Sequence, residues 1–175
     1  MKGIIIFNSQ TGFTKKYAEW LRESTNFECF EFKKAKRKNL SEYDTIIFAS
    51  WLMAGTLSKL NWFKKKLTLL SNKKIIIVAI GGSPAENPDN AQALSNLFTQ
   101  DELSNTNIKS FYCPGGLNYE KMNFFSKSLM KMFVTMLLNK KDASKNDIKA
   151  AKMMRKSYDL SDKKHIEKIL TEINN

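Results

Sequence analysis

The sequence predicts a single α/β domain built on a doubly wound, five-stranded parallel sheet in the order 2-1-3-4-5. Five strand-like runs alternate with helical patterns along the 175 residues, a length that suits one domain with a full core. The run at residues 74–80 is apolar almost throughout, as in a strand buried on both faces. Loops rich in glycine and hydroxyl residues follow several runs, at the end of the sheet where such folds bind ligands.

The first half of the chain contains three of the predicted strands. Residues 2–7 form a β-branched, apolar run, and a helix is expected at residues 13–23. The inward face of that helix should consist of Tyr17, Ala18 and Leu21. Residues 27–32 alternate Phe and Cys with Glu, which indicates a second strand. The third strand is expected at residues 45–49, after a short polar segment.

The middle of the chain continues the alternation of helices and strands. A helix at residues 57–70 is expected to lead into the strand at 74–80. Gly81, Gly82, Ser83 and Pro84 then break that strand. A helix near residues 91–98 and a fifth strand at 108–113 complete the pattern expected of the sheet.

A helix rich in Met and Phe is expected at residues 123–138. Four polar residues gather on one narrow face of this helix, namely Lys127, Ser128, Lys131 and Thr135. The rest of its circumference is apolar, which is wider than docking on one sheet requires. The surplus could hold an apolar substrate, a partner subunit or a membrane surface. The alternative is that the C-terminal helices cover it, since Met-rich faces commonly belong to a core.

Residues 140–175 are predicted to be a charged helical extension that packs on the same single domain, residues 1–175. Helices are expected at residues 145–158 and 162–173. An apolar stripe at i, i+3, i+4 and i+7 should dock the last helix on the sheet: Ile166, Ile169, Leu170 and Ile173. The sole histidine, His165, is expected in the first turn of that helix, facing solvent. No metal site or Ser/His/Asp constellation is predicted.

The composition bears on which partners and which cellular location we expect. The net charge is +12, with lysine clusters at residues 33–38 and 64–66, so an anionic partner is one explanation and lysine as a default surface residue is the other. No run is long enough to span a membrane, and the N-terminus leads directly into a strand. Cys29 and Cys113 show no metal or redox spacing and are expected as buried thiols. We therefore expect a cytoplasmic protein, with membrane association left open.

The loop after the first strand has the pattern of a phosphate site. A strand that runs into a helix through hydroxyl residues and a glycine brings free amides and the positive end of the helix dipole together. Gly12 would allow close approach of a ligand. The spacing matches neither a P-loop nor a dinucleotide turn, but it resembles the phosphate loop of flavodoxins. Alternatively, these residues only cap a helix. The candidate cofactor-binding residues are Ser9, Gln10, Thr11, Gly12, Phe13 and Thr14.

Two further loops are predicted at the same edge of the sheet. The loop after the third strand combines an aromatic, soft apolar side chains and a glycine, which suits a flat flavin ring. Trp51 is the candidate for contact with the ring, unless it is simply an aromatic at the edge of the core. The residues concerned are Ser50, Trp51, Leu52, Met53, Ala54 and Gly55. The loop after the fourth strand adds Gly81, Gly82 and Ser83, without an aromatic residue.

A glycine-containing turn follows the fifth strand and leads into the Met- and Phe-rich helix. It consists of Gly115, Gly116, Leu117, Asn118 and Tyr119, which we regard as candidate substrate or partner contacts. Together with residues 9–14 and the loop at residues 49–55, this turn resembles the flavodoxin-type protoporphyrinogen oxidases, whose members pass electrons to menaquinone. The resemblance covers residues 1–139 and, more loosely, the C-terminal helices.

This resemblance implies an FMN-dependent oxidoreductase. Its reaction would be the oxidation of protoporphyrinogen or a related substrate, with a quinone as acceptor, and FMN as the cofactor. The redox partner is then a small molecule or quinone, with peripheral membrane contact as a further expectation and nucleic acid not expected. One alternative is a one-electron carrier that docks on an acidic protein. The other is a basic binding module that holds no flavin. The sequence leaves the oligomeric state open.

Overall fold

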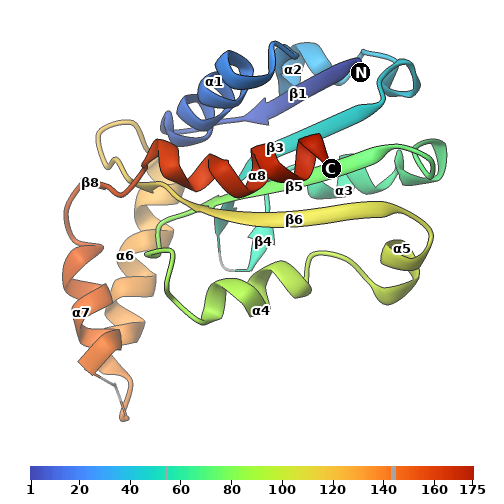
Figure 1. Cartoon of the computed structure of the whole chain (residues 1–175). Coiled ribbons are helices and arrows are strands. Elements are labelled where there is room, and N and C mark those ends of the chain that lie inside the picture. The colour runs from blue at the N-terminus through green and yellow to red at the C-terminus, as the bar shows by residue number, and fades with distance from the viewer. Residues whose placement is uncertain (54, 143–144) are drawn as a thin grey trace.

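The computed structural model contains the predicted doubly wound sheet (Figure 1). It describes residues 1–53, 55–142 and 145–175. Five parallel strands lie in the order β2-β1-β3-β5-β6, which is the predicted order 2-1-3-4-5 once the short hairpin strand β4 is set aside. Their bounds are β1 Gly3–Asn8, β2 Glu28–Glu31, β3 Thr45–Met53, β5 Lys74–Gly81 and β6 Asn107–Pro114. Strand β4, Thr56–Leu57, pairs antiparallel with the end of β3.

The central strands are buried on both faces, which explains their continuous apolar runs. Successive side chains point to opposite faces of a strand, so Ile46 and Phe48 join one core cluster while Ile47 joins the other. Residues Ile75 to Ala79 of β5 are fully buried. Burial on both sides fixes the register, because a slip of one residue would exchange the two faces of every strand.

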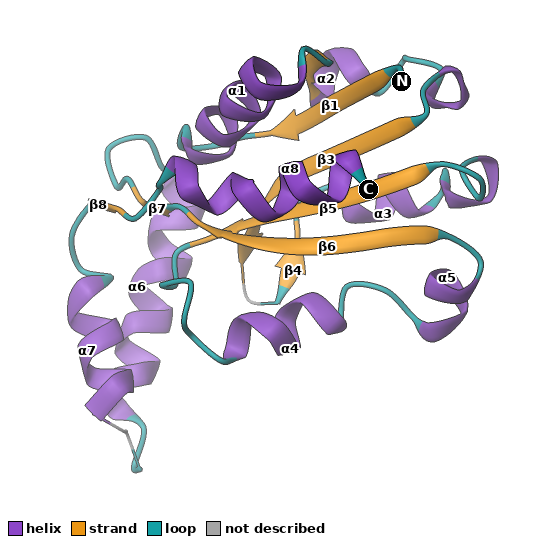
Figure 2. Ribbon diagram, viewed as in Figure 1, coloured by secondary structure: helices purple, strands orange, loops and turns teal. Residues whose placement is uncertain are grey.

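Helices cover both faces of the sheet (Figure 2). One face packs against α1, Phe13–Thr25, and α8, Glu167–Asn174, which crosses in front of the strands. The other face packs against shorter elements. These are α2 Phe32–Ala35, η1 Leu40–Glu42, α3 Leu60–Lys64, η2 Leu67–Leu69, α4 Asp89–Ser95 and α5 Gln100–Ser104. The predicted stripe on the last helix is confirmed, since Ile166, Ile169 and Ile173 are buried in the core.

A long insertion separates β6 from the last helix. A two-stranded antiparallel ribbon, β7 Gly116–Leu117 and β8 Tyr158–Asp159, forms its base. Between these strands, α6, Phe124–Asn139, and α7, Lys145–Met153, pack side by side; we call them the α6–α7 hairpin. Figure 1 shows the hairpin projecting from the end of the sheet toward which β1 points, which we call the carboxyl edge.

Several predicted boundaries were wrong. The third strand continues to Met53, because β4 pairs with residues expected to be a loop. The helix predicted at 57–70 is replaced by two shorter elements, α3 and η2. Leu57 is not helical, because it pairs with Leu52 as part of β4. Phe32 begins α2 instead of ending β2, and α5 was not anticipated.

The C-terminal region also differs in detail from the prediction. Helix α7 ends at Met153, and Tyr158 lies in β8. His165 is half-buried in the short 3-10 helix η3, Lys163–Ile166, just before α8. Cys113 is buried as predicted, whereas Cys29 is only partly buried. Within the described ranges, no helix is long and apolar enough to cross a membrane.

Candidate functional site

The loop between β1 and α1 offers unpaired backbone donors at a helix N-terminus. Gly12 adopts a left-handed φ of 106°, and a Cβ placed on it would meet no atom within 4 Å. Its N–H donates to Ser9 Oγ at 3.2 Å. In the described part of the chain, no acceptor lies against the backbone N–H groups of Gln10, Thr11 or Thr14. Free amides at a helix N-terminus, with open space at Gly12, suit an anionic oxygen ligand.

The side chains of this first loop, residues 9–14, divide into two groups. Gln10 reaches the insertion, where its Nε2 donates to Ser126 Oγ at 3.1 Å. Phe13 also faces the insertion, because a Cβ on Gly116 would lie 2.9 Å from its ring. The hydroxyls of Thr11 and Thr14 make no hydrogen bond within the described residues, although Thr14 is only 2% exposed. These two hydroxyls are therefore available to a ligand, whereas Gln10 and Phe13 hold the loop in place.

The second loop, residues 50–58, is tied to β1 by a small polar network. Asn8 Nδ2 donates to Ser50 Oγ at 3.3 Å and to Ser58 Oγ at 3.1 Å. The hydroxyl of Ser50 donates to the Ser58 carbonyl at 2.7 Å and is fully buried. Ser50 thus links β3 to the end of β1, and its hydroxyl already donates its proton to the Ser58 carbonyl.

The remaining residues predicted in this loop lie nearer the surface. Trp51 is half-buried in β3, opposite Ile80 of β5. Leu52 and Met53 pair with β4, and Ala54 lies outside the described residues. Gly55 has a φ of 73° with open space around its Cα. Trp51 and Gly55 therefore remain the candidates for contact with a ring, although the aromatic belongs to a strand instead of a loop.

Two tyrosines that we did not predict hold the third loop, residues 81–83. Tyr112 Oη accepts from the Ser83 N–H at 2.9 Å and donates to the Ser83 carbonyl at 2.8 Å. Tyr158 Oη donates to the Gly82 carbonyl at 2.7 Å. Burial raises the pKa of Tyr112 to about 12, and burial likewise raises the pKa of Tyr158, so both hydroxyls keep their protons at neutral pH. Tyr158 is 76 residues from Gly82, so no local pattern could have indicated the contact.

The glycine turn, residues 115–119, anchors the insertion to the sheet. Gly115 N–H donates to the Gly81 carbonyl at 2.7 Å. A Cβ on Gly116 would lie 2.1 Å from the Tyr158 carbonyl oxygen, so only glycine allows this close approach. Tyr119 Oη donates to the Met154 carbonyl, which links the two ends of the hairpin. Leu117 is buried, and Asn118 closes the next turn by accepting from the N–H of Lys121.

A further group of contacts joins the first helix to the end of the insertion. Tyr17 Oη donates to the Pro114 carbonyl at 2.7 Å and accepts from the Asp162 N–H at 3.3 Å. Lys16 Nζ contacts Asp159 at 3.1 Å. Burial raises the pKa of Asp159, but hydrogen bonds from Ser161 and Lys16 outweigh this and lower it overall. The carboxylate is therefore charged at neutral pH, and Lys16 is paired with it.

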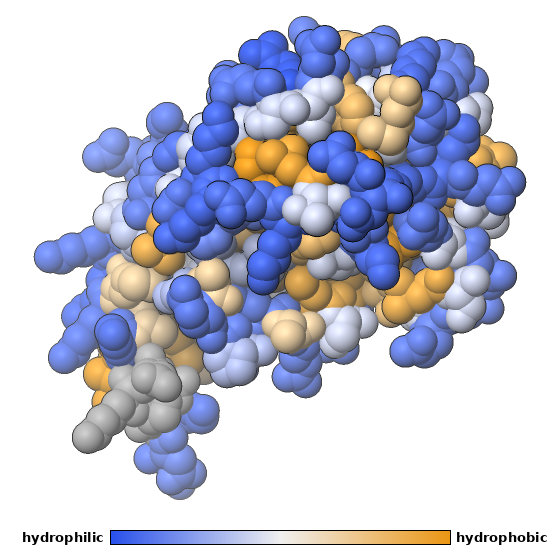
Figure 3. Space-filling view, in the orientation of Figure 1, coloured by the Kyte–Doolittle hydropathy of each residue, from blue (hydrophilic) through white to orange (hydrophobic). Residues whose placement is uncertain are grey.

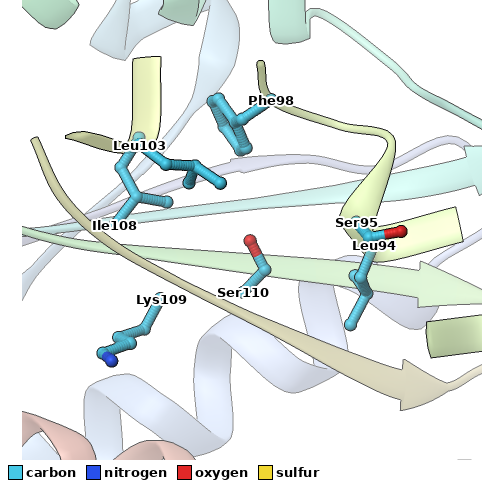
Figure 4. Close-up of a pocket in the computed structure, with 7 residues that line it drawn as sticks. All are labelled: Leu94, Ser95, Phe98, Leu103, Ile108, Lys109 and Ser110. Atoms are coloured by element: carbon cyan, nitrogen blue, oxygen red, sulfur yellow. The ribbon is translucent and has the colours of Figure 1, made fainter. Parts of the chain in front are cut away.

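Two hollows in the structure lie away from these loops. One, of about 250 Å³, lies beside the β6 edge (Figure 4) and is lined by Leu94, Ser95, Phe98, Leu103, Ile108, Lys109 and Ser110. The other, of about 480 Å³, lies at the opposite end of the sheet, around Met1 and Phe27. Neither contains a residue of the three loops. These two hollows are therefore not part of the candidate site.

The charged residues give the site little side-chain chemistry of its own. Lys64, from one predicted lysine cluster, pairs with Glu102 of α5 at 2.7 Å, and Lys74 bonds to carbonyls at the C-terminus of α8. Lys74 lies away from the carboxyl edge, because it is the first residue of β5. Among the described residues, no group of three or more His, Cys, Asp or Glu side chains could hold a metal ion.

Comparison with known proteins agrees with this arrangement of strands and loops. The family model described as "Flavodoxin domain" matches residues 4–145. The chain belongs to the flavodoxin domain family. The matched residues include all three loops, the glycine turn and helix α6. No curated protein sequence matches the chain significantly.

Solved structures share the flavodoxin-like fold at low sequence identity. A provisionally assigned flavoprotein from Bacteroides eggerthii superposes with a TM-score of 0.50 at 13% identity, covering 73% of this chain and 94% of that one. The NAD(P)H:quinone oxidoreductase from Methanothermobacter marburgensis also gives 0.50, at 11% identity, covering 89% and 94%. A Lactobacillus acidophilus flavoprotein solved in complex with FMN gives 0.44 at 18% identity, covering 63% and 91%. The two structures with a TM-score of 0.50 support the fold alone.

Proposed function

We propose that this flavodoxin-domain protein is an FMN-dependent oxidoreductase. The observation that carries the proposal is the first loop, where the N–H groups of Gln10, Thr11 and Thr14 have no acceptor within the described residues and the space at the Cβ position of Gly12 is open. This loop lies at the switch point between β1 and β3, where doubly wound sheets bind their ligands. FMN, when bound, supplies hydride and electron transfer at its ring.

The residues present fit the chemistry of this cofactor. Loop amides and the hydroxyls of Thr11 and Thr14 would hold a phosphate without a basic side chain. Trp51 and Gly55 would border the ring, while Tyr112 and Tyr158 would fix the carbonyls and amide of the third loop beside it. In these roles the protein binds and orients, and no side chain is required as a general base.

We further propose that the reaction resembles that of the flavodoxin-type protoporphyrinogen oxidases. The sequence features behind this finer proposal are the glycine turn at residues 115–119 and the Met- and Phe-rich helix that follows it. A porphyrinogen carries carboxylates, which the chain's net charge of +12 would attract. The electrons and protons that the porphyrinogen loses would leave in pairs on successive quinone molecules, each of which is reduced to its quinol.

An anaerobic turnover assay tests the reaction. Protein loaded with FMN is mixed with protoporphyrinogen and a soluble menaquinone analogue, and the fluorescence of protoporphyrin is followed. We expect product only when protein, FMN and quinone are all present. Retained flavin without product would reject the porphyrinogen substrate. Retained flavin that only exchanges single electrons with a protein partner would instead identify a one-electron carrier.

A further inference from the structure

One side of helix α6 presents apolar side chains to solvent along most of its length. Phe124 is 89% exposed, Phe125 73%, Met132 63% and Met136 59%. At 100° per residue, Phe125, Met132 and Met136 fall within a narrow arc of the helix surface. The opposite side is the one that packs on the protein, because Ser126 and Val134 are buried there. The width of the apolar face predicted from the sequence therefore includes a part that no element covers among the described residues.

Residues 121–156, which include α6 and α7, carry most of the net positive charge of the chain. Residues 121–156 contain ten Lys or Arg and two Asp, which accounts for eight of the twelve net positive charges in about a fifth of the sequence. Lys121, Lys127 and Lys131 form no ion pair in the part of the chain that the structure describes. A general enrichment in surface lysine would not concentrate charge in this way.

We propose that the α6–α7 hairpin docks this protein on an anionic lipid surface. Phe124, Phe125, Met132 and Met136 enter the headgroup region, and the exposed side chains of Lys121 and Lys131 contact lipid phosphates. Figure 3 shows apolar atoms lying among hydrophilic side chains over this projecting hairpin, at the lower left. A basic helix with aromatic and methionine side chains on its exposed face has the composition of an interfacial membrane helix.

Charge and shape favour a membrane over other occupants. A second copy of the chain would bring two strongly positive hairpins together, which like-charge repulsion opposes. An acidic protein would satisfy the charges, but its own apolar groove would have to receive side chains spread from Phe124 to Met136 on a projecting helix. A bilayer offers hydrocarbon beneath a plane of anionic phosphates, so it matches both features at once.

The docked position has a consequence for the candidate site, and this consequence rests on the proposed function. Ser126, at the start of α6, contacts Gln10 of the first loop, and Tyr158 joins the base of the insertion to Gly82. The hairpin thus extends from the edge of the sheet that would hold FMN. Docking through α6 would bring that edge close to acceptors dissolved in the membrane, such as quinones.

Co-sedimentation with vesicles tests the docking without any flavin chemistry. The full chain is mixed with vesicles of phosphatidylcholine, or of phosphatidylcholine and phosphatidylglycerol in equal parts. We expect about tenfold tighter binding or more to the anionic vesicles, weakening as ionic strength rises. The double variant F124S/F125S should lower the affinity at least about tenfold, because two aromatic side chains no longer enter the interface.

Matched variants elsewhere on the surface provide the controls. Leu69, 68% exposed in η2, is the apolar control, and L69S should bind like the unaltered chain. K121Q/K131Q should weaken binding, whereas K33Q/K34Q, in the lysine cluster at residues 33–38, should not. Equal losses from hairpin and control variants would reject the proposal, as would absence of vesicle binding by the unaltered chain. A dimer that F124S/F125S dissociates, without vesicle binding, would assign the face to a second copy. None of these results depends on FMN, so the proposed function is tested separately.

Discussion

At the scale of single residues, backbone groups of the first loop and the hydroxyls of two partly buried tyrosines have different roles at the carboxyl edge. Gly12 allows a left-handed backbone conformation, with open space at its Cβ position. Tyr112 and Tyr158 use their hydroxyls to fix carbonyls and an amide of the third loop. The first arrangement would bind a ligand, and the second would hold the surface on which the ligand lies.

Replacement of Gly12 by alanine should impair the loop in two ways. A side chain at φ 106° costs at least about 1 kcal/mol of stability, and its Cβ would occupy space beside the loop that is open in the structure. We expect G12A to lower FMN affinity about tenfold or more. Titration followed by quenching of flavin fluorescence measures this, with circular dichroism as the check on folding. Unchanged affinity in a folded G12A protein would show that the phosphate lies elsewhere.

Removal of the tyrosine hydroxyls should loosen the third loop. Y158F loses one hydrogen bond, worth about 1 kcal/mol, whereas Y112F leaves both the N–H and the carbonyl of Ser83 without a partner and should cost about 1–3 kcal/mol. Both variants should bind FMN more weakly, and Y112F more so. Y43F is the matched control, because Tyr43 bonds to Glu28 at the opposite end of the sheet. Y43F should lower stability in urea while leaving FMN affinity unchanged; an equal loss of affinity would contradict a local role.

The sequence indicated Gly12 and the loop hydroxyls because a strand, a short polar turn and a helix follow one another along the chain. Ser50 was predicted to face a ligand, and the structure instead places its hydroxyl in the network with Asn8 and Ser58. Tyr158 could not be found, because its contact with Gly82 depends on how a long insertion returns to the sheet. Local patterns predict local geometry, and contacts between distant segments require the fold.

At the scale of secondary-structure elements, strands buried on both faces were the most predictable. Residues 74–80 were predicted as a strand, and β5 extends one residue further, to Gly81. Elements near the surface were less predictable: β4, α3 and η2 replace one predicted helix. Short elements bury few side chains, so the hydrophobic period that reveals a helix is too brief to be read.

The capping box of α5 makes a prediction about pH. Burial raises the pKa of Glu102, but hydrogen bonds from Lys64 and from Thr99, together with the charge of Lys64, lower it overall. A carboxyl whose pKa is depressed by folding contributes stability above its unfolded pKa, and that stability is lost as pH falls through the folded pKa. Because both side chains of the pair are about a quarter exposed, we expect only about 0.5 kcal/mol.

Urea unfolding of E102Q measures this contribution. Glutamine keeps the capping geometry but removes the charge. The variant should be less stable than the unaltered chain at neutral pH, and the difference should disappear only as pH falls through the depressed pKa of folded Glu102, below the ordinary glutamate pKa of about 4.3. E23Q is the control, since Glu23 pairs with Lys163 in a largely exposed pair and should change little. A difference between E102Q and the unaltered chain that persists in acid would show that packing, not charge, is responsible.

At the scale of the whole molecule, a flavodoxin-like sheet carries a basic insertion at its ligand-binding edge. The sheet order and the last helix were predicted, because both depend on apolar residues that must be buried. The apolar face of α6 was predicted to be wider than one contact requires, and four of its large side chains are more than half exposed. Sequence periodicity describes such a face but does not say what covers it.

The central claim is that the carboxyl-edge loops bind FMN, and reconstitution tests it most directly. Purified protein is incubated with excess FMN and desalted, and its absorbance and flavin fluorescence are recorded. We predict retained flavin in a ratio of about one per chain, with quenched fluorescence and an affinity in the micromolar range or tighter. Colourless protein after desalting, from a sample shown to be folded, would contradict the account and leave the first loop as a helix cap or as a site for another phosphate.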